Sequence, residues 1–465
     1  MKDGEKHGAR RRLIKALALA GAGGAFPGII RAQGDDKPYA GTTLNVSVFS
    51  GTFQKLLRGW IPEFEKQTGI KVNYDTPSFP IYNQRTDLEL STHGSGLDVA
   101  NLTFIYSGRW IGAGWFTPLD DFIARRTPAS WDLDDILPGA RAPETGADGK
   151  LYAIPWNVEV VLAAAARFDL VREAGLDFPQ TTDEFLAVLK AVNKKDRSAG
   201  FATDNHYGWT FPPYLHAFGG DVFVDAPGNL LPALDTPQAI AAADYFAHLL
   251  RDYGPDGVIS YTTDQTVQSL KTGRTNFSTM GQSHLSLIGD ASSSKTVHSS
   301  AFGLIPAGPE GRFPGVAVHG LGIPLGARNK EAAWEFIKWA TSSSIALRAV
   351  EAGYGSPARR SALASPAYAQ RQNINGYDLS SLAIESVDLA AKGGYMKYRT
   401  VPVFPQVDQQ LNKAIELIVS GQYSAQKAMQ QAQAQSVAEL KRAGIKLRPN
   451  PPWGRGPLGL YGDSA

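Results

Sequence analysis

The feature that most constrains the fold is a regular alternation of strand and helix signals near the amino-terminal end of the chain. Apolar and polar residues alternate over residues 44–49, and apolar residues recur at helical spacing over residues 52–67. A second strand is predicted at residues 71–74, a second helix at 82–91 and a third strand at 98–103. Because consecutive parallel strands need helical crossovers, this order predicts an α/β fold built on a parallel sheet.

Strand and helix signals continue along the rest of the chain. Strands are predicted at residues 151–157, 302–306 and 316–324, and helices at 183–192, 237–251, 330–341 and 408–443. The Gly- and Pro-rich residues 446–465 are predicted to form a flexible tail. A chain of 465 residues is long enough for two or three domains of ordinary size.

The chain contains no cysteine, and its charge is unevenly distributed. Without cysteine there can be no disulfides, thiolate metal sites or thiol catalysis. The net charge is +2, but residues 1–32 carry seven Lys or Arg residues against two acidic ones, and the rest of the chain is slightly acidic. A nucleic-acid-binding protein keeps its basic excess in the folded body, so the sequence predicts no nucleic-acid partner.

Residues 1–32 have the composition of an export signal. A basic cluster precedes a weakly apolar, Gly- and Ala-rich run over residues 13–30, and Ala32 offers a small residue for cleavage. The pair Arg10-Arg11 resembles that of a twin-arginine signal, and the alternative is a basic amphipathic arm. Because no cysteine follows the apolar run, we expect a soluble periplasmic protein that is not a lipoprotein.

The motifs of common enzyme classes are absent from the sequence. There is no phosphate-binding loop, no dinucleotide-binding glycine pattern after a strand, no HExxH and no GxSxG. The eight histidines are scattered, and each is interpreted as a surface or packing residue. We therefore predict no catalytic residues, no metal site and no cofactor, and we interpret the chain as a binding protein rather than an enzyme.

Six short segments carry motifs that occur together, in this order, in one protein family. They are FEKQTGIKV at residues 64–72, GSGLDV at 94–99, GWFTPLDD at 114–121, DGKLYAIP at 148–155, AAWEFIKW at 332–339 and GSPARRS at 355–361. Together they resemble the extracellular solute-binding proteins of family 1, the sugar-type receptors of ABC importers. One departure is the polar Gln282, in a region where the family often has an aromatic residue.

The resemblance implies two α/β lobes, each a mainly parallel sheet flanked by helices, with a ligand cleft at the hinge between them. We expect residues 40–150 and about 300–350 in the first lobe, and residues 151–299 and about 351–445 in the second. The resemblance also implies a monomer that captures a carbohydrate or polyol by cleft closure. Such a protein delivers its ligand to the membrane permease subunits of an ABC importer.

Twelve residues are candidates for ligand contact, because polyhydroxylated ligands need aromatic faces together with fixed donors and acceptors. They lie at expected strand ends, loops and lobe junctions: Phe49, Ser50, Tyr106, Trp156, Asn157, Glu159, Asp204, Trp209, Gln282, His319, Gly320 and Arg359. Asp204 and Trp209 are predicted in a loop. Gly320 is expected to allow close backbone approach, and Arg359 to hold vicinal hydroxyls or a carboxylate. For each residue the alternative is a packing or surface role.

Two other functions stay open at the level of sequence. An exported glycoside-active enzyme would place two carboxylates about 5–10 Å apart across a pocket. A receptor for a different solute, such as a polyamine, would need a carboxylate-rich cleft, for which Glu159 and Asp204 are candidates.

Overall fold

The computed structural model describes residues 37–194, 197–224, 231–392, 397–401, 403–444 and 446. Contacts group the chain from Gly41 onward into one compact unit, and the architecture below belongs to this unit. The predicted export signal, and all of the predicted tail except Lys446, lie outside the described residues. Among the helices that are described, none is long and apolar enough to cross a membrane.

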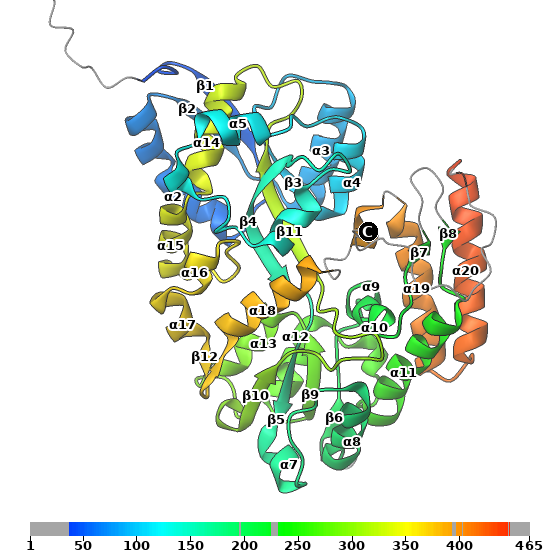
Figure 1. Ribbon diagram of the computed structural model, residues 1–465. Helices are drawn as coiled ribbons and strands as arrows, with labels where there is room; N and C mark the ends of the chain where they lie inside the picture. Colours follow the sequence, from blue (N-terminus) through cyan, green and yellow to red (C-terminus); the bar gives the residue numbers. More distant parts are fainter. Residues whose placement is uncertain are drawn as a thin grey trace, which may run out of the picture. The chain divides into compact units, whose positions relative to one another are not determined.

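The first large sheet contains the strand–helix alternation expected from the sequence. Its order is β2-β1-β3-β11-β4, with the strands at Lys71–Asp75, Thr43–Ser47, Val99–Thr103, Val316–Gly322 and Ala153–Val160. β1 pairs in parallel with β2 and β3, and α2 (Thr52–Thr68) and α3 (Phe79–Ser91) form the crossovers (Figure 1). β11 is antiparallel to both β3 and β4, so the sheet as a whole is mixed.

The second large sheet is mostly antiparallel. Its order is β10-β5-β9-β6, with the strands at Ser300–Gly303, Ala163–Arg167, Thr275–Met280 and Ala199–Phe201. β5 is antiparallel to β10 and β9, and β6 is parallel to β9. Mainly parallel sheets were expected. The difference arises partly because β5 enters from β4 of the first sheet and β10 leads back toward β11, so β5 and β10 run in opposite directions.

The chain passes between the two sheets along hydrogen-bonded segments. β4 reaches β5 through Val161 and Leu162, and β10 returns to β11 through residues 304–315. The N–H of Val161 donates to the carbonyl of Gly315 (3.0 Å). The N–H of Leu162 donates to the carbonyl of Pro314 (2.9 Å), so the outward and return segments are joined. We refer to these paired segments as the passage.

The chain crosses between the two sheets at positions that differ from the expected lobe boundaries. β4 pairs in the first sheet, although the division at residue 151 assigned it to the second lobe. β10 pairs in the second sheet, although residues 300–350 were assigned to the first lobe. The chain therefore changes sheets at residues 161–162 and 304–315, because strand pairing continues up to the start of the passage.

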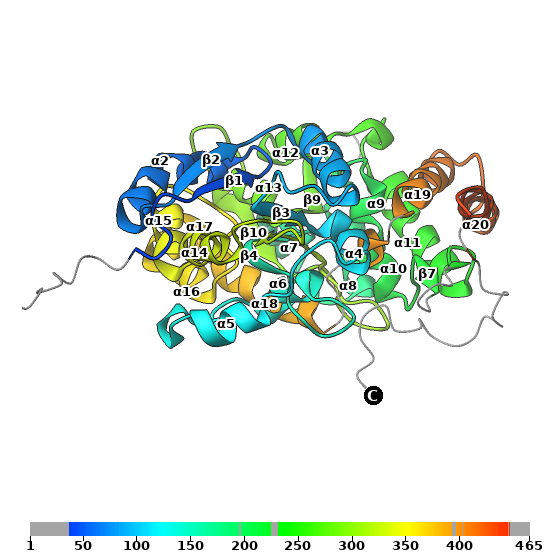
Figure 2. The same cartoon turned by 90° about the horizontal axis from the view of Figure 1, so that it is seen from above.

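Helices flank both sheets. Besides α2 and α3, they are α4 (Phe104–Gly112), α5 (Asp120–Arg126), α6 (Pro138–Arg141), α7 (Phe168–Glu173), α8 (Thr182–Val192), α9 (Tyr207–Thr210), α10 (Pro212–Ala217), α11 (Pro237–Tyr253), α12 (Thr263–Lys271), α13 (Gln282–Leu285), α14 (Lys330–Ala340), α15 (Ser343–Glu351), α16 (Arg360–Leu363), α17 (Pro366–Gln372), α18 (Leu379–Ala391), α19 (Phe404–Val419) and α20 (Ala425–Arg442). α19 and α20 pack against each other and against α11 (Figure 2).

The expected loop around Trp209 contains α9 and α10, because Pro212 fits the first turn of a helix.

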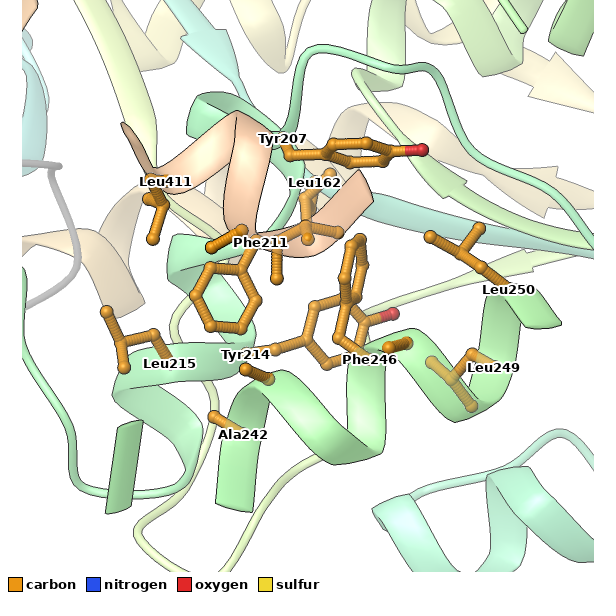
Figure 3. Close-up of a cluster of buried hydrophobic side chains, with 14 of the residues drawn as sticks. Leu162, Tyr207, Phe211, Tyr214, Leu215, Ala242, Phe246, Leu249, Leu250 and Leu411 are labelled. Carbon is orange, nitrogen blue, oxygen red and sulfur yellow. The ribbon is translucent and has the colours of Figure 1, made fainter. Parts of the chain in front are cut away.

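A large buried apolar cluster joins α9, α10, α11 and α19. Figure 3 shows its centre, where the Phe246 ring lies 5.6 Å from that of Phe211 and 5.2 Å from that of Tyr214. Leu411 of α19 and Leu162 of the passage belong to the same cluster. The carboxyl-terminal helices are therefore part of the core that borders the second sheet.

His216 is a buried titratable group on α10. Its side chain is buried, and Nδ1 lies 3.1 Å from the carbonyl oxygen of Gly220. The rings of Phe313 and Tyr398 lie 6.0 and 5.6 Å away. Burial lowers the pKa of His216 to about 4 from an ordinary value of 6.5, and the bond to Gly220 only partly opposes this effect.

Replacing His216 with Gln is expected to make stability less sensitive to mild acid. The unfolded chain takes up a proton near pH 6.5, whereas folded His216 resists protonation until about pH 4. Stability therefore falls as the pH drops through this range, and from pH 7 to pH 5 the loss from His216 is about 2 kcal/mol. Urea unfolding at both pH values measures this loss, which His216→Gln should lack.

The exposed His298 provides the matched control. His298→Gln should keep the wild-type loss of stability between pH 7 and pH 5. An equal loss in the wild type and in His216→Gln would contradict the assignment.

Candidate functional site

A cavity of about 250 Å³ lies beside the passage. It is bordered by β4, β11, α9, the start of α12 and the start of α13. Its lining residues are Glu159, Val160, Val161, Asp204, His206, Trp209, Thr210, Thr263, Gly281, His284 and Ala317. The structure thus brings three of the predicted residues, Glu159, Asp204 and Trp209, to one cavity.

Glu159 lies on the cavity wall formed by the first sheet. It pairs directly with Ala317 across β4 and β11, so both side chains lie on the same face. Its Oε1 accepts a hydrogen bond from Ser283 Oγ at 2.6 Å. Because Ser283 belongs to α13, which follows β9 of the second sheet, the Glu159 carboxylate links elements of both sheets.

Asp204 lies between β6 and α9 and is only 8% exposed. One carboxylate oxygen accepts the backbone N–H of His206 (3.1 Å), and the other accepts the hydroxyl of Thr263 (3.2 Å). His206 and Thr263 also line the cavity. These bonds therefore fix a polar edge on the second-sheet side of the cavity.

Trp209 supplies aromatic surface to the cavity and is half-buried on α9. Its ring meets Phe104 edge to face, with 5.6 Å between the ring centroids. Phe104 is the first residue of α4 and directly follows β3 of the first sheet. This ring contact is a second link between elements of the two sheets.

A cluster of rings continues from Phe104 along the first sheet. The ring of His319 lies 5.8 Å from Phe104, 4.7 Å from Phe49 and 6.1 Å from Trp156. Trp156 in turn stacks on Phe53, with centroids 4.8 Å apart and ring planes 8° apart. The predicted residues Phe49, Trp156 and His319 therefore lie together, next to the cavity rather than in its lining.

His319 is neutral in this cluster. Its Nδ1 is buried and has no hydrogen-bond partner in the described part of the chain. Burial lowers the pKa of His319 to about 3. The ring can therefore offer an apolar face and a neutral hydrogen-bonding group over the whole physiological pH range.

Trp156 is too enclosed for its expected role as a stacking surface. Its side chain is 7% exposed, and its Nε1–H donates to Asn101 Oδ1 at 2.7 Å. Phe53 covers one face of the indole. These contacts assign Trp156 to the core of the first sheet.

Ser50 and Tyr106 also lie outside the cavity lining. Ser50 is exposed, and its N–H donates to the carbonyl of Pro77 at 2.7 Å. Tyr106 lies on α4 and stacks on Trp110, with ring centroids 5.0 Å apart. Their contacts belong to the first-sheet side of the molecule.

Asn157 and Gln282 are buried near the passage and bond to the protein itself. Asn157 Nδ2 donates to the hydroxyl of Tyr354 (2.8 Å), and Gln282 Nε2 donates to the carbonyl of Leu379. Gln282 lines a separate cavity of about 200 Å³, to which Glu159 also contributes.

Gly320 is required for packing rather than for the approach of a ligand. A Cβ at this position would lie 2.8 Å from the Cβ of Ala153 and 3.2 Å from the Cδ of Glu144. Glu144 is fully buried, its carboxyl has no hydrogen-bond partner among the described residues, and burial raises its pKa well above the usual range. Because Glu144 does not line the cavity, this acid is not placed to protonate a ligand there.

Arg359 does not contact the cavity, contrary to expectation. It is 1% exposed, and its Nε donates to the carbonyl of Thr341 (2.7 Å). Its Nη1 donates to the carbonyl of Asp132 (2.8 Å) and to a carboxylate oxygen of Asp135 (3.1 Å). Its Cζ lies 4.8 Å from the centroid of the Trp131 ring. The guanidinium thus joins segments of the chain and is not accessible to a ligand.

His206, Thr210 and Thr263 are cavity residues that the sequence analysis did not select. One sequence signal could have pointed to Thr263. It follows Thr262, which forms a capping box with Gln265 and so marks the start of α12. A helix start placed beside the Asp204 loop requires the tertiary structure, which the motif alone does not provide.

The cavity lining is acidic. It contains Glu159 and Asp204, whereas none of the described lining residues is Lys or Arg. No group of three or more His, Asp or Glu side chains suited to a metal ion occurs in the described ranges. The chemistry on offer is therefore hydrogen-bond acceptance from hydroxyl or ammonium groups and contact with an indole ring.

Comparisons with known proteins identify the class to which the chain belongs. The family of bacterial extracellular solute-binding proteins matches residues 50–346, and the chain is a member of that family. This match confirms the resemblance found in the sequence motifs.

Individual relatives extend over most of the chain. The chain is 25% identical to the mannitol-binding protein of Pseudomonas aeruginosa over 384 residues, 78% of this chain and 85% of the relative. It is 25% identical to the erythritol/L-threitol-binding protein of Mycolicibacterium smegmatis over 403 residues, 76% of this chain and 81% of the relative.

Solved structures confirm the two-lobe α/β fold. An ABC transporter solute-binding protein of Agrobacterium radiobacter K84, solved in complex with ribitol, aligns with a TM-score of 0.69 at 24% identity. The alignment covers 87% of this chain and 100% of that chain.

Trp156→Ala is expected to lower stability rather than ligand affinity. Removing an indole that stacks on Phe53 and bonds to Asn101 should reduce the unfolding free energy by ~3–5 kcal/mol. Ligand affinity should change less than about threefold, a difference under 1 kcal/mol. Chemical unfolding and calorimetry on the same variant separate the two effects.

Trp60, half-buried beneath Arg348, is the control for loss of an indole outside the core. Trp60→Ala should lower the unfolding free energy by about 1 kcal/mol or less. Unchanged stability of Trp156→Ala together with a large loss of affinity would show that Trp156 contacts the ligand.

Proposed function

We propose that the protein captures an acyclic polyol in the cavity beside the passage. The observation that carries this proposal is the cavity lining itself, in which Glu159, Asp204 and Trp209 meet where elements of both sheets converge. Carboxylates accept hydrogen bonds from hydroxyl groups, and an indole ring covers the C–H surface of a carbon chain. A cavity of about 250 Å³ suits a small ligand rather than a long oligosaccharide.

The relatives support the choice of a polyol. Two of the similar proteins are named for binding mannitol and erythritol or L-threitol, and the third was solved with ribitol. All four compounds are unbranched chains of hydroxylated carbons, with no ring and no charge. The acidic lining favours a neutral polyol over an anionic sugar acid. The carboxylate of a sugar acid would face Glu159 and Asp204 without a compensating Lys or Arg.

We further propose that ligand binding closes the cleft by a hinge motion at the passage. The closed monomer would then deliver the polyol to the permease subunits of an ABC importer. The basic and apolar pattern of residues 1–32 supports export through the twin-arginine route to the periplasm.

The enzyme alternative has weaker support in the site. Glu159 accepts a hydroxyl hydrogen bond and Asp204 accepts two hydrogen bonds, so both carboxylates have positioning partners. Glu144, the carboxyl whose pKa burial raises well above its usual range, does not line the cavity. We therefore propose a receptor that leaves its ligand chemically unchanged.

The purified mature protein is expected to bind ribitol or D-mannitol, and Asp204→Asn is expected to weaken that binding. A hydrogen bond to a charged acceptor contributes about 1.5–3 kcal/mol, so Kd should rise roughly 10- to 100-fold. Isothermal titration calorimetry measures the affinity, and a ligand-dependent rise in melting temperature provides an independent readout.

Asp388, which pairs with Arg360 on the surface, gives the matched control. Asp388→Asn should bind as the wild type does. Tighter binding of an aldonic acid than of the alditol of the same length would contradict the proposed neutral ligand. Recovery of a hydrolysed or oxidised product of the ligand would show that the protein is an enzyme.

Changing both Arg10 and Arg11 to Lys is expected to retain the precursor in the cytoplasm, because the twin-arginine route requires the arginine pair. Cell fractionation measures delivery, and Arg12→Lys should have a smaller effect. Normal delivery of the double variant would show that the general secretory route is sufficient.

A further inference from the structure

Arg399 lies directly behind the aromatic residue of the cavity. Its Cζ is 4.0 Å from the centroid of the Trp209 ring and 4.8 Å from that of Phe404. Its Nη1 donates to the carbonyl of Gly208 at 2.9 Å. The side chain is only 7% exposed, so this guanidinium contacts two rings and the backbone next to Trp209 while largely shielded from water.

The backbone just before Trp209 is held from a second direction. A Cβ at Gly208 would fall 1.4 Å from a carboxylate oxygen of Asp408, so glycine at this position lets the Asp408 side chain of α19 lie against the backbone. The Asp408 carboxylate in turn accepts a hydrogen bond from Asn412 Nδ2 at 3.2 Å. Gly208 and Trp209 are therefore fixed by residues from the carboxyl-terminal part of the chain.

We propose that Arg399 is a positioning residue that presents Trp209 to the ligand and thereby sets the affinity of the cavity. This inference rests on the proposed function. One face of the indole is covered by the guanidinium at 4.0 Å, so a ligand must meet the opposite face or an edge. An indole already fixed in the free protein loses less conformational freedom on binding, and affinity rises accordingly.

Arginine is suited to this role in a way that lysine is not. A planar guanidinium can stack on a ring and at the same time donate in its own plane to a carbonyl oxygen. Arg399 does both, toward Trp209 and Gly208. A lysine ammonium is a compact charge with no planar face, so it cannot reproduce both contacts.

The decisive experiment is a double-mutant cycle on Arg399 and Trp209, read by calorimetry with ribitol and D-mannitol. Arg399→Gln and Arg399→Lys are each expected to raise Kd about five- to thirtyfold, the range between an exposed and a desolvated cation–π contact. In the Trp209→Ala background, Arg399→Gln should have no further effect on Kd, because the residue through which Arg399 acts is gone.

Arg359 provides a control for the loss of a buried arginine that stacks on tryptophan. It lies 4.8 Å from the Trp131 ring, is 1% exposed and does not line the cavity. Arg359→Gln should lower the melting temperature but leave Kd unchanged. A Kd shift in Arg399→Gln no larger than that in Arg359→Gln would overturn the proposal, as would an equal shift in the presence and absence of the Trp209 ring.

A measurement without ligand separates this proposal from the proposed function. The difference between wild type and Trp209→Phe isolates the near-ultraviolet circular dichroism of Trp209, and this signal should weaken in Arg399→Gln and Arg399→Lys. An unchanged signal would overturn the positioning role. If the wild type binds no alditol while this signal is lost, the proposed function fails and the positioning of Trp209 by Arg399 stands.

Discussion

The antiparallel pairing of β4 with β11 is the constraint on which the rest of the structure depends. It joins the strand that leaves the first sheet to the strand that returns to it, and the pairing continues as two backbone hydrogen bonds through the passage. Breaking these bonds would leave buried backbone groups unsatisfied, so the two segments must move together. A hinge motion that bends the pair without unzipping it is the least costly way to open and close a cleft beside it.

The same pairing determines where the functional groups lie. Ala317 and His319 are two residues apart on β11 and therefore point to the same face. Ala317 pairs with Glu159 at the cavity, and His319 lies in the ring cluster with Phe49 and Trp156. The cavity and the ring cluster are thus neighbouring parts of one surface, whereas Gly320 contacts the buried Glu144.

Local patterns were enough to predict several elements, but not β5, β6 and β9 of the second sheet, and not the surroundings of individual side chains. The alternation over residues 44–103 depends on nearby residues and was predicted correctly. The burial of Arg359 was not predicted, because Asp132 and Asp135, which accept two of its hydrogen bonds, lie more than 200 residues away in sequence. The enclosure of Trp156 was not predicted for a similar reason, since its partner Asn101 lies 55 residues away. Arg399, 191 residues from Gly208, carries no sequence signal of its role.

The most direct test of the account is a crystal structure of the mature protein with ribitol or D-mannitol bound. The polyol is expected in the cavity beside the passage, with hydroxyl groups donating to Glu159 and Asp204 and the carbon chain against Trp209. The 200 Å³ cavity lined by Gln282 should contain no polyol. A polyol found there, or in contact with neither carboxylate, would contradict the account.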